Sequence, residues 1–145
     1  MDELLIKRFD TSLPLPAYKT AGAAAFDLSP RLDATIEPKT YQMIPLNVAI
    51  KLPQGYFGLL TSRSSLHKKG LMFANDMGII DSDYCGDNDE YKAVLYNFSD
   101  EPVTLPKGER IVQVVVLPAT QFPIREVDKL EAPDRGGFGE ATGKN

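Results

Sequence analysis

Arg110-Ile111-Val112-Gln113-Val114-Val115-Val116-Leu117 is the most strand-like stretch of this chain, with four valines and one isoleucine. β-Branched side chains in such a run favour a central strand of a sheet. Other runs of similar character precede it, and turn sequences such as Pro53-Gln54-Gly55 separate them. These runs cover residues 41–52, 56–61, 92–97 and 101–105. Short strands spaced by turns predict an all-β fold, either a sandwich, a barrel or a jelly roll.

Two segments depart from the strand pattern. Residues 64–69 predict one short helix, with Ser62 or Ser64 as its N-cap. Residues 134–143 hold four glycines around a single aromatic, Phe138. A segment so rich in glycine cannot build a core. We therefore expect a β domain over residues 1–132 and a mobile C-terminal arm over residues 133–145.

Length and composition describe one ordinary globular domain. The chain has 145 residues, of which 43% are hydrophobic and 25% are charged. A net charge of −4 argues against a general nucleic-acid binder, which needs a basic face. Cys85 is the single cysteine, so an intrachain disulfide is excluded. No apolar run is long enough to span a membrane and no secretory signal begins the chain, so we expect a soluble, cytoplasmic protein.

The stretch Gly78-Ile79-Ile80-Asp81-Ser82-Asp83-Tyr84 carries the clearest chemistry. In a strand, Asp81 and Asp83 would share one face and could orient a water or a metal beside the ring of Tyr84. Asp-Ser-Asp is also ordinary turn chemistry. Taken alone, the stretch favours the turn.

Further polar stretches suit a phosphate or a base. Arg63-Ser64-Ser65-Leu66 combines a guanidinium, two hydroxyls and a helix start, although a capped surface helix has the same sequence. The glycine-rich tail could wrap phosphates while Phe138 stacks on a base. Asp27 follows small residues and would either face a cation or begin a turn. Gln113 and Arg110 would lie on opposite faces of a strand.

Taken in order, five stretches resemble the motifs of the trimeric dUTP diphosphatase (dUTPase) family. The resemblance covers residues 24–143, and the motifs correspond to residues 24–28, 63–70, 78–86, 108–113 and 135–143. It implies a jelly-roll-like β subunit and a homotrimer with three active sites, each built from all three chains. It also implies Mg²⁺-dependent hydrolysis of dUTP to dUMP and pyrophosphate, which limits uracil incorporation into DNA and supplies dUMP for dTMP synthesis.

The resemblance implies a role for each matching residue. Asp81 would activate the water that attacks the α-phosphorus, and Tyr84 would pack against the deoxyribose and leave no room for a 2′-hydroxyl. Asp27 would hold Mg²⁺ through water. The uracil would be read by backbone groups of a hairpin over residues 75–80. The implied substrate contacts are Arg63, Ser64, Ser65, Asn75, Gly78, Ile80, Tyr84, Gln113, Arg135, Phe138 and Gly139.

The chain departs from the family pattern at several points. Ser65 replaces a usual glycine, and Cys85 stands where arginine or glutamine is common. The run Asp87-Asn88-Asp89-Glu90 lengthens the loop after motif three, and we interpret it as a solvated acidic tip or a second cation site. Motif five is the most altered, because only two glycines separate Arg135 from Phe138. Arg135 would contact the γ-phosphate in the family arrangement.

Two alternatives stay open. One is the related dCTP deaminase, including its bifunctional deaminase–diphosphatase form, which motif two resembles better. Deamination needs a carboxylate three residues before the asparagine matched by Asn97, and Val94 stands there. The other alternative is a non-catalytic trimer that binds a protein partner. His67 lies beside Lys68 and Lys69, and we interpret it as a solvated surface residue.

Overall fold

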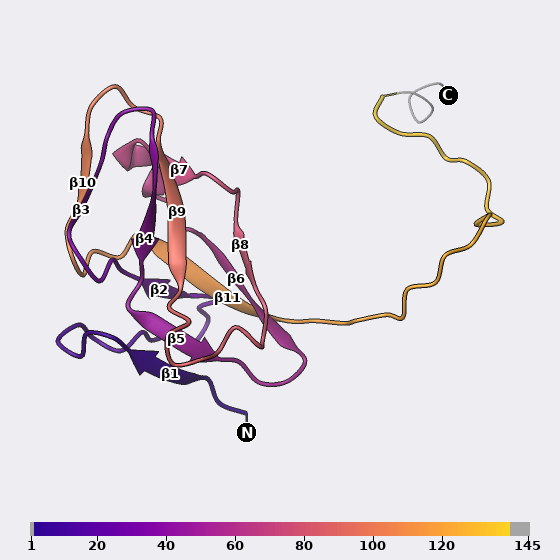
Figure 1. The fold of residues 1–145 in the computed structure, drawn as a ribbon, viewed down its shortest axis with the longest axis horizontal. Helices are drawn as coiled ribbons and strands as arrows, with labels where there is room; N and C mark the ends of the chain where they lie inside the picture. Colours follow the sequence, from indigo (N-terminus) through magenta and orange to yellow (C-terminus); the bar gives the residue numbers. More distant parts are fainter. Residues whose placement is uncertain (1, 140–145) are drawn as a thin grey trace.

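The chain is almost entirely β structure, as its turn-spaced apolar runs predict. The computed structural model describes residues 2–139, and in these residues there are eleven strands and one short 3-10 helix (Figure 1). In chain order they are β1 (Leu5–Arg8), β2 (Phe26–Leu28), β3 (Ala34–Ile36), β4 (Tyr41–Pro45), β5 (Val48–Lys51), β6 (Tyr56–Ser62), η1 (Leu66–Lys69), β7 (Leu71–Phe73), β8 (Gly78–Ile80), β9 (Lys92–Asn97), β10 (Val103–Leu105) and β11 (Val112–Pro118).

The described strands form four antiparallel groups. The largest sheet has the order β2-β11-β6-β8, and a second sheet has the order β4-β9-β7. Two further pairs, β1-β5 and β10-β3, complete the body (Figure 1). Every pairing in the described residues is antiparallel. This arrangement confirms the all-β prediction.

Strand β11 occupies the central position that its valines predict. It pairs with β2 on one side and with β6 on the other. Val112 and Val114 are completely buried, while Gln113 between them points to the opposite face and is half-buried. Successive side chains of a strand alternate between faces, so a valine-rich strand supplies the core while one polar residue is left for the surface. Leu95 and Leu105, from other sheets, are buried in the same core cluster.

Two local expectations were wrong. Residues 41–52 form two strands, β4 and β5, because the chain turns at Asn47, whose φ is 72°. The short helix is a 3-10 turn that begins after Ser65, and no side chain caps it, so neither Ser62 nor Ser64 is the N-cap. The helix ends at Gly70, whose φ of 81° lies in the left-handed region that favours glycine.

The segment after β11 leaves the body of the molecule. Residues 119–139 contain no strand or helix and run away from the sheets (Figure 1). Their large apolar side chains are exposed, including Ile124, Leu130 and Phe138. The predicted arm at 133–145 begins within this segment, and residues 140–145 lie outside the described part of the chain.

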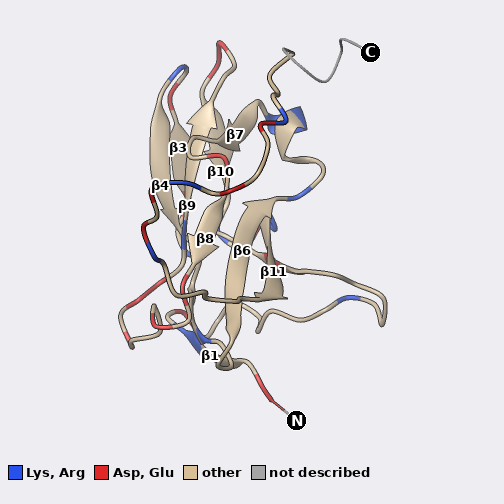
Figure 2. Ribbon diagram, turned by 90° about the vertical axis from the view of Figure 1, so that its right-hand side faces the viewer, with Lys and Arg blue, Asp and Glu red and all other residues tan. Residues whose placement is uncertain are grey.

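Two further features of the described residues are the distribution of charge and the length of helices. In Figure 2, acidic and basic residues are interspersed over loops and strand ends of the visible face. Within residues 2–139, no helix has the length and hydropathy that crossing a membrane requires.

Candidate active site

Asp81 and Tyr84 lie on a tight turn directly after strand β8. The backbone N–H of Tyr84 donates to the carbonyl oxygen of Asp81 at 3.1 Å, which is the hydrogen bond of a β-turn. The turn interpretation of this stretch is therefore correct, and Asp81 and Asp83 do not share a strand face. Both Asp81 and Tyr84 are exposed. They border a pocket whose other lining residues are Leu60, Gly78, Ile79, Ile80, Tyr91 and Lys92.

Gly78 allows β8 to approach β6 closely beneath this pocket. Gly78 faces Leu60 across the two strands. A Cβ atom at position 78 would lie 3.2 Å from the Cβ atom of Leu60, which is tighter than ordinary packing. A side chain at this position would require Leu60 or β8, which leads into the turn of Asp81, to shift by a few tenths of an ångström.

Tyr84 is oriented by its hydroxyl end. The phenol Oη donates to the backbone carbonyl of Glu90 at 3.0 Å, and the ring lies 6.3 Å from the ring of Tyr91. Burial of this end raises the pKa of Tyr84, and the nearby carboxylates of Asp89 and Glu90 raise it further. The phenol therefore stays protonated and remains a hydrogen-bond donor near neutral pH.

A second group of polar residues surrounds Asp27 on β2. Oδ2 of Asp27 lies 3.3 Å from Nε of Arg63 and 3.2 Å from Nη1 of Arg110. Gln113 is directly opposite Asp27 on the neighbouring strand, and its Nε2 donates to the carbonyl oxygen of Ser62 at 2.9 Å. The carboxylate thus holds two guanidinium groups beside the exposed hydroxyls of Ser64 and Ser65. Two fixed cations next to hydroxyls can bind a phosphate.

The sequence did not predict that Lys68, Lys69 and Arg110 would lie together. Arg63, Ser65, Lys68, Lys69, Glu109 and Arg110 line one surface pocket. The sequence predicts Arg110 only as a residue on the strand face opposite Gln113, and it names Lys68 and Lys69 only as neighbours of His67. The signal that could have located Arg110 was its position within the fourth motif. His67 itself is exposed, as expected.

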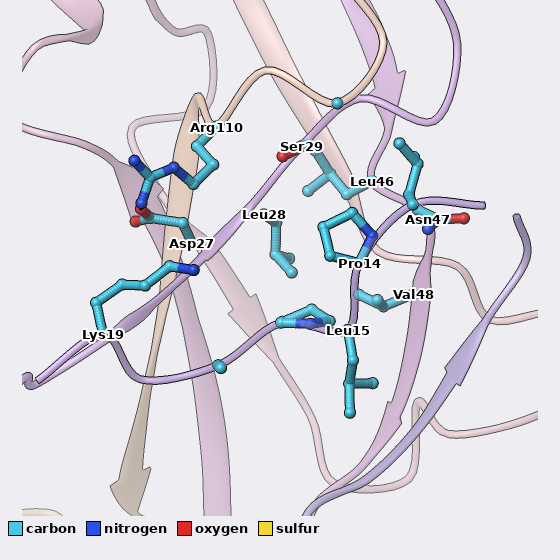
Figure 3. A pocket seen from close by; sticks show the side chains of 14 residues that line it. Pro14, Leu15, Lys19, Asp27, Leu28, Ser29, Leu46, Asn47, Val48 and Arg110 are labelled. Atoms are coloured by element: carbon cyan, nitrogen blue, oxygen red, sulfur yellow. The ribbon is translucent and has the colours of Figure 1, made fainter. Parts of the chain in front are cut away.

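Figure 3 shows how Asp27 and Arg110 sit at one end of an adjoining pocket. Their side chains point toward each other, and Lys19 lines the same pocket. Farther from these charged groups the pocket is lined by Pro14, Leu15 and Val48, and Asn47 lies at its far side. Arg110 lines both this pocket and the cationic surface pocket.

The predicted hairpin over residues 75–80 is wrong in its connectivity. β7 pairs with β9, whereas β8 pairs with β6, so the segment between β7 and β8 crosses from one sheet to the other. Asn75 is exposed in this crossover, and its carbonyl oxygen accepts a hydrogen bond from the N–H of Met77 at 2.8 Å. Its backbone is accessible, but it is not part of a two-stranded ribbon.

The acidic run after Gly86 is only partly solvated. Asp87 is exposed, and Oδ2 of Asp89 accepts the N–H of Gly86 at 2.7 Å. Glu90, however, is 6% exposed and pairs with Arg31. The interpretation as a fully solvated tip is therefore wrong for Glu90. In the described residues, no group of three or more histidine, cysteine or acidic side chains is placed to hold a metal ion.

The two polar groups lie at opposite ends of strand β6. Gly58 faces Ile80, the residue before Asp81, and Arg63 is five residues further along the strand direction. At 3.3 Å per residue this separation is roughly 17 Å. Arg135, Phe138 and Gly139 lie on the segment that leaves the body (Figure 1). Within one chain, Asp81 thus lies at the other end of β6 from Arg63, whereas Arg63 and Ser64 line one pocket with Ala74 and Asp76, the neighbours of Asn75.

Comparison with known proteins identifies the class. The family model described as dUTPase matches residues 11–142. The deoxyuridine 5′-triphosphate nucleotidohydrolase of Methylocella silvestris is 42% identical over 134 residues, covering 88% of this chain and 82% of the relative. That of Shewanella oneidensis is 38% identical over 148 residues, covering 98% of this chain and 95% of the relative. The crystal structure of the Streptococcus mutans dUTPase superposes with a TM-score of 0.74 at 32% identity, covering 81% of this chain and 98% of that one.

These likenesses and the motif order lead to one identification. The fold is the jelly-roll-like β fold of dUTPases. The chain belongs to the dUTPase family.

Proposed function

We propose that this protein is an enzyme that hydrolyses dUTP to dUMP and pyrophosphate. The observation that carries the proposal is the exposed turn with Asp81 and Tyr84, which borders a pocket next to the close contact of β6 and β8. The relatives from Methylocella silvestris and Shewanella oneidensis are deoxyuridine 5′-triphosphate nucleotidohydrolases, a name that describes hydrolysis of the same nucleotide. The uracil is read by backbone groups of Asn75, Gly78 and Ile80, and Tyr84 packs against the deoxyribose.

The chemical step is an in-line displacement at the α-phosphorus. The carboxylate of Asp81 takes a proton from water as the water oxygen bonds to phosphorus. The bond from the α-phosphorus to the α–β bridging oxygen breaks, and pyrophosphate leaves. No covalent enzyme intermediate is needed. Because charge develops on the phosphoryl oxygens, fixed cations near them stabilise the transition state.

The second polar group binds the phosphates. Arg63, Ser64, Ser65 and Gln113 contact the triphosphate, and Asp27 keeps Arg63 in position through the 3.3 Å contact. In the C-terminal segment, Phe138 and Gly139 cover the uracil and Arg135 reaches the γ-phosphate. Closing this segment excludes water from the reacting atoms. The division into a body over residues 1–132 and a closing arm over residues 133–145 is part of the same proposal.

The donor set fits a magnesium ion that arrives with the substrate. The described residues offer no acidic cluster for a metal held by protein alone. Mg²⁺ usually keeps several waters and takes phosphate oxygens as ligands, so one carboxylate acting through water is sufficient. Asp27 is that carboxylate in our proposal. The ion would supply charge neutralisation at the phosphates.

The same proposal places the sites between the chains of a homotrimer. Gly58, which marks the Asp81 end of β6, and Arg63 are roughly 17 Å apart along the strand direction, and this separation supports Asp81 and Ser64 of one site coming from different chains. The outer face of the β4-β9-β7 sheet has the composition of an interface. Tyr41, Met43 and Met72 are 70%, 57% and 50% exposed there, beside Val94 and Tyr96.

The cellular role follows from the reaction. Removing dUTP limits uracil incorporation into DNA, and the product dUMP supplies dTMP synthesis. Neither task requires a nucleic-acid partner or a membrane, and both place the enzyme inside the cell.

Product analysis tests the proposal. Wild type and Asp81→Asn are each offered dUTP and dCTP with Mg²⁺. We expect dUMP and pyrophosphate from dUTP only, and a kcat about 10²–10⁴-fold lower in Asp81→Asn, because a general base contributes that much. Uracil products from dCTP would indicate a deaminase, and no turnover of either nucleotide would overturn the proposed activity.

A further inference from the structure

Tyr84 is fixed at one end only. The residue is 39% exposed and lines the pocket of Asp81, and its hydroxyl donates to the carbonyl oxygen of Glu90 at 3.0 Å. The position of the ring therefore depends on where the backbone of Glu90 lies. That backbone belongs to residues 81–91, which connect β8 to β9 without regular structure.

Glu90 is the one charged residue that is buried among residues 2–139. Its carboxylate forms a two-point pair with Arg31, from Nε to Oε1 at 2.8 Å and from Nη2 to Oε2 at 3.1 Å. Oε1 also accepts the backbone N–H of Asn47 at 2.9 Å. A planar guanidinium bound through two parallel contacts fixes both the distance and the angle of its partner.

This pair ties the loop to two distant parts of the body. Arg31 lies in the connection between β2 and β3, and Asn47 lies between β4 and β5. Burying a charge is costly unless the charge is paired, and an apolar pair of the same volume is often no less stable. The pair therefore contributes more to the position of the loop than to the free energy of folding. The position that it fixes is that of the Glu90 backbone, whose carbonyl oxygen accepts the Tyr84 hydroxyl.

We propose that Arg31 and Glu90 are positioning residues that hold the ring of Tyr84 against the deoxyribose and so enforce rejection of ribonucleotides. The proposal rests on the proposed dUTP hydrolysis. Neither side chain touches the substrate. Both act through the backbone of Glu90 and the hydrogen bond that it accepts from Tyr84.

The test is selectivity, measured as kcat/KM for dUTP divided by kcat/KM for UTP. Arg31→Gln and Glu90→Gln should each lower this ratio about three- to tenfold, the amount that one hydrogen bond contributes. The change should lie in KM for dUTP and in UTP turnover, with kcat for dUTP nearly unchanged. Glu90→Gln keeps an acceptor for the N–H of Asn47, so it provides a folded variant if Arg31→Gln does not fold.

Two controls separate positioning from general destabilisation. Leu105→Ala removes a buried side chain from β10 and should lower the melting temperature without changing selectivity. Tyr84→Phe keeps the ring but removes the hydroxyl. Adding Arg31→Gln to Tyr84→Phe should produce no further loss, because both changes break the same connection.

The outcomes distinguish this inference from the proposed function. Wild type that discriminates against UTP, together with unchanged selectivity in both glutamine variants, would overturn the inference alone. Additive losses in the double variant would also overturn it. Absence of dUTP turnover by wild type would overturn the proposed function and this inference with it.

Discussion

Oδ2 of Asp27 lies 3.3 Å from Nε of Arg63, and the side chain of Asp27 is only 15% exposed. The same oxygen is 3.2 Å from Nη1 of Arg110, so one carboxylate orders two guanidinium groups, one directly after β6 and the other just before β11. Without Asp27 the two cations would repel each other and adopt many positions. The carboxylate therefore fixes the positions of both guanidinium groups.

Asp27→Asn should weaken substrate binding in our proposal. Charge-assisted hydrogen bonds contribute about 1.5–3 kcal/mol each, so losing the order of Arg63 should raise KM for dUTP at least about tenfold. Steady-state kinetics checks this at fixed ionic strength. Asp33→Asn is the matched control, because it removes the same charge while an amide oxygen can still accept the N–H of Lys107. An unchanged KM in Asp27→Asn would contradict the assigned role.

Shared sites predict that two inactive variants restore activity when mixed. Asp81→Asn and Arg63→Ala would each disable every site of their own trimer. After joint refolding, about a quarter of the sites should combine an intact Asp81 from one chain with an intact Arg63 from another, if chains assort at random. Activity is measured before and after exchange of subunits.

The matched control for the mixing experiment changes two residues that lie on the same turn. Asp81→Asn mixed with Tyr84→Ala should stay inactive, because Asp81 and Tyr84 lie on one turn and reach the site from one chain. Recovery in this control, or none in the first mixture, would exclude the proposed division of the site.

The exposed face of the β4-β9-β7 sheet should hold the oligomer together. Met43 is 57% exposed on β4, where it faces Val94 of β9. Met43→Lys would place a charge in an apolar interface and should shift the protein toward monomers, with loss of activity. Sedimentation measures the assembly state. Leu32→Lys, at a similarly exposed leucine in the loop between β2 and β3, should leave the assembly unchanged.

Local patterns predicted the fold better than they predicted the site. Strand β11 was found because alternation and β-branching act within a few residues. The partners of Asp27 are not local, since Arg110 is 83 residues away in the chain. Sequence gives the charge of such a residue but not the strand order that brings the two together.

The acidic run shows the same limit. A row of Asp, Asn and Glu normally marks a solvated tip, and Asp87 follows that rule. Glu90 departs from it because Arg31, 59 residues earlier, reaches into the loop. The arm is a different case, since Phe138 is exposed on a segment without strand or helix and its motif predicts a role that its surroundings in one chain do not test.

Asp10 should make the fold sensitive to acid. Hydrogen bonds from Lys107 and Ser12 hold the pKa of the Asp10 carboxyl well below its ordinary value of 3.8. A depressed pKa in the folded state means that the stabilisation is fully present above that ordinary value and is lost as the pH falls below it. Nζ of Lys107 lies 2.5 Å from Oδ2 of Asp10, and this pair joins the N-terminal loop to the turn before β11.

Asp10→Asn should therefore melt at a lower temperature than wild type at pH 7, and this difference should shrink steadily from about pH 4 downward. Thermal melts in buffers of different pH at constant ionic strength measure the melting temperatures of wild type and Asp10→Asn. Asp33→Asn again serves as the matched control for loss of one acidic charge, because its amide oxygen can still accept the N–H of Lys107. A difference that stays constant for Asp10→Asn down to pH 2 would mean that the carboxylate charge does not stabilise the folded state.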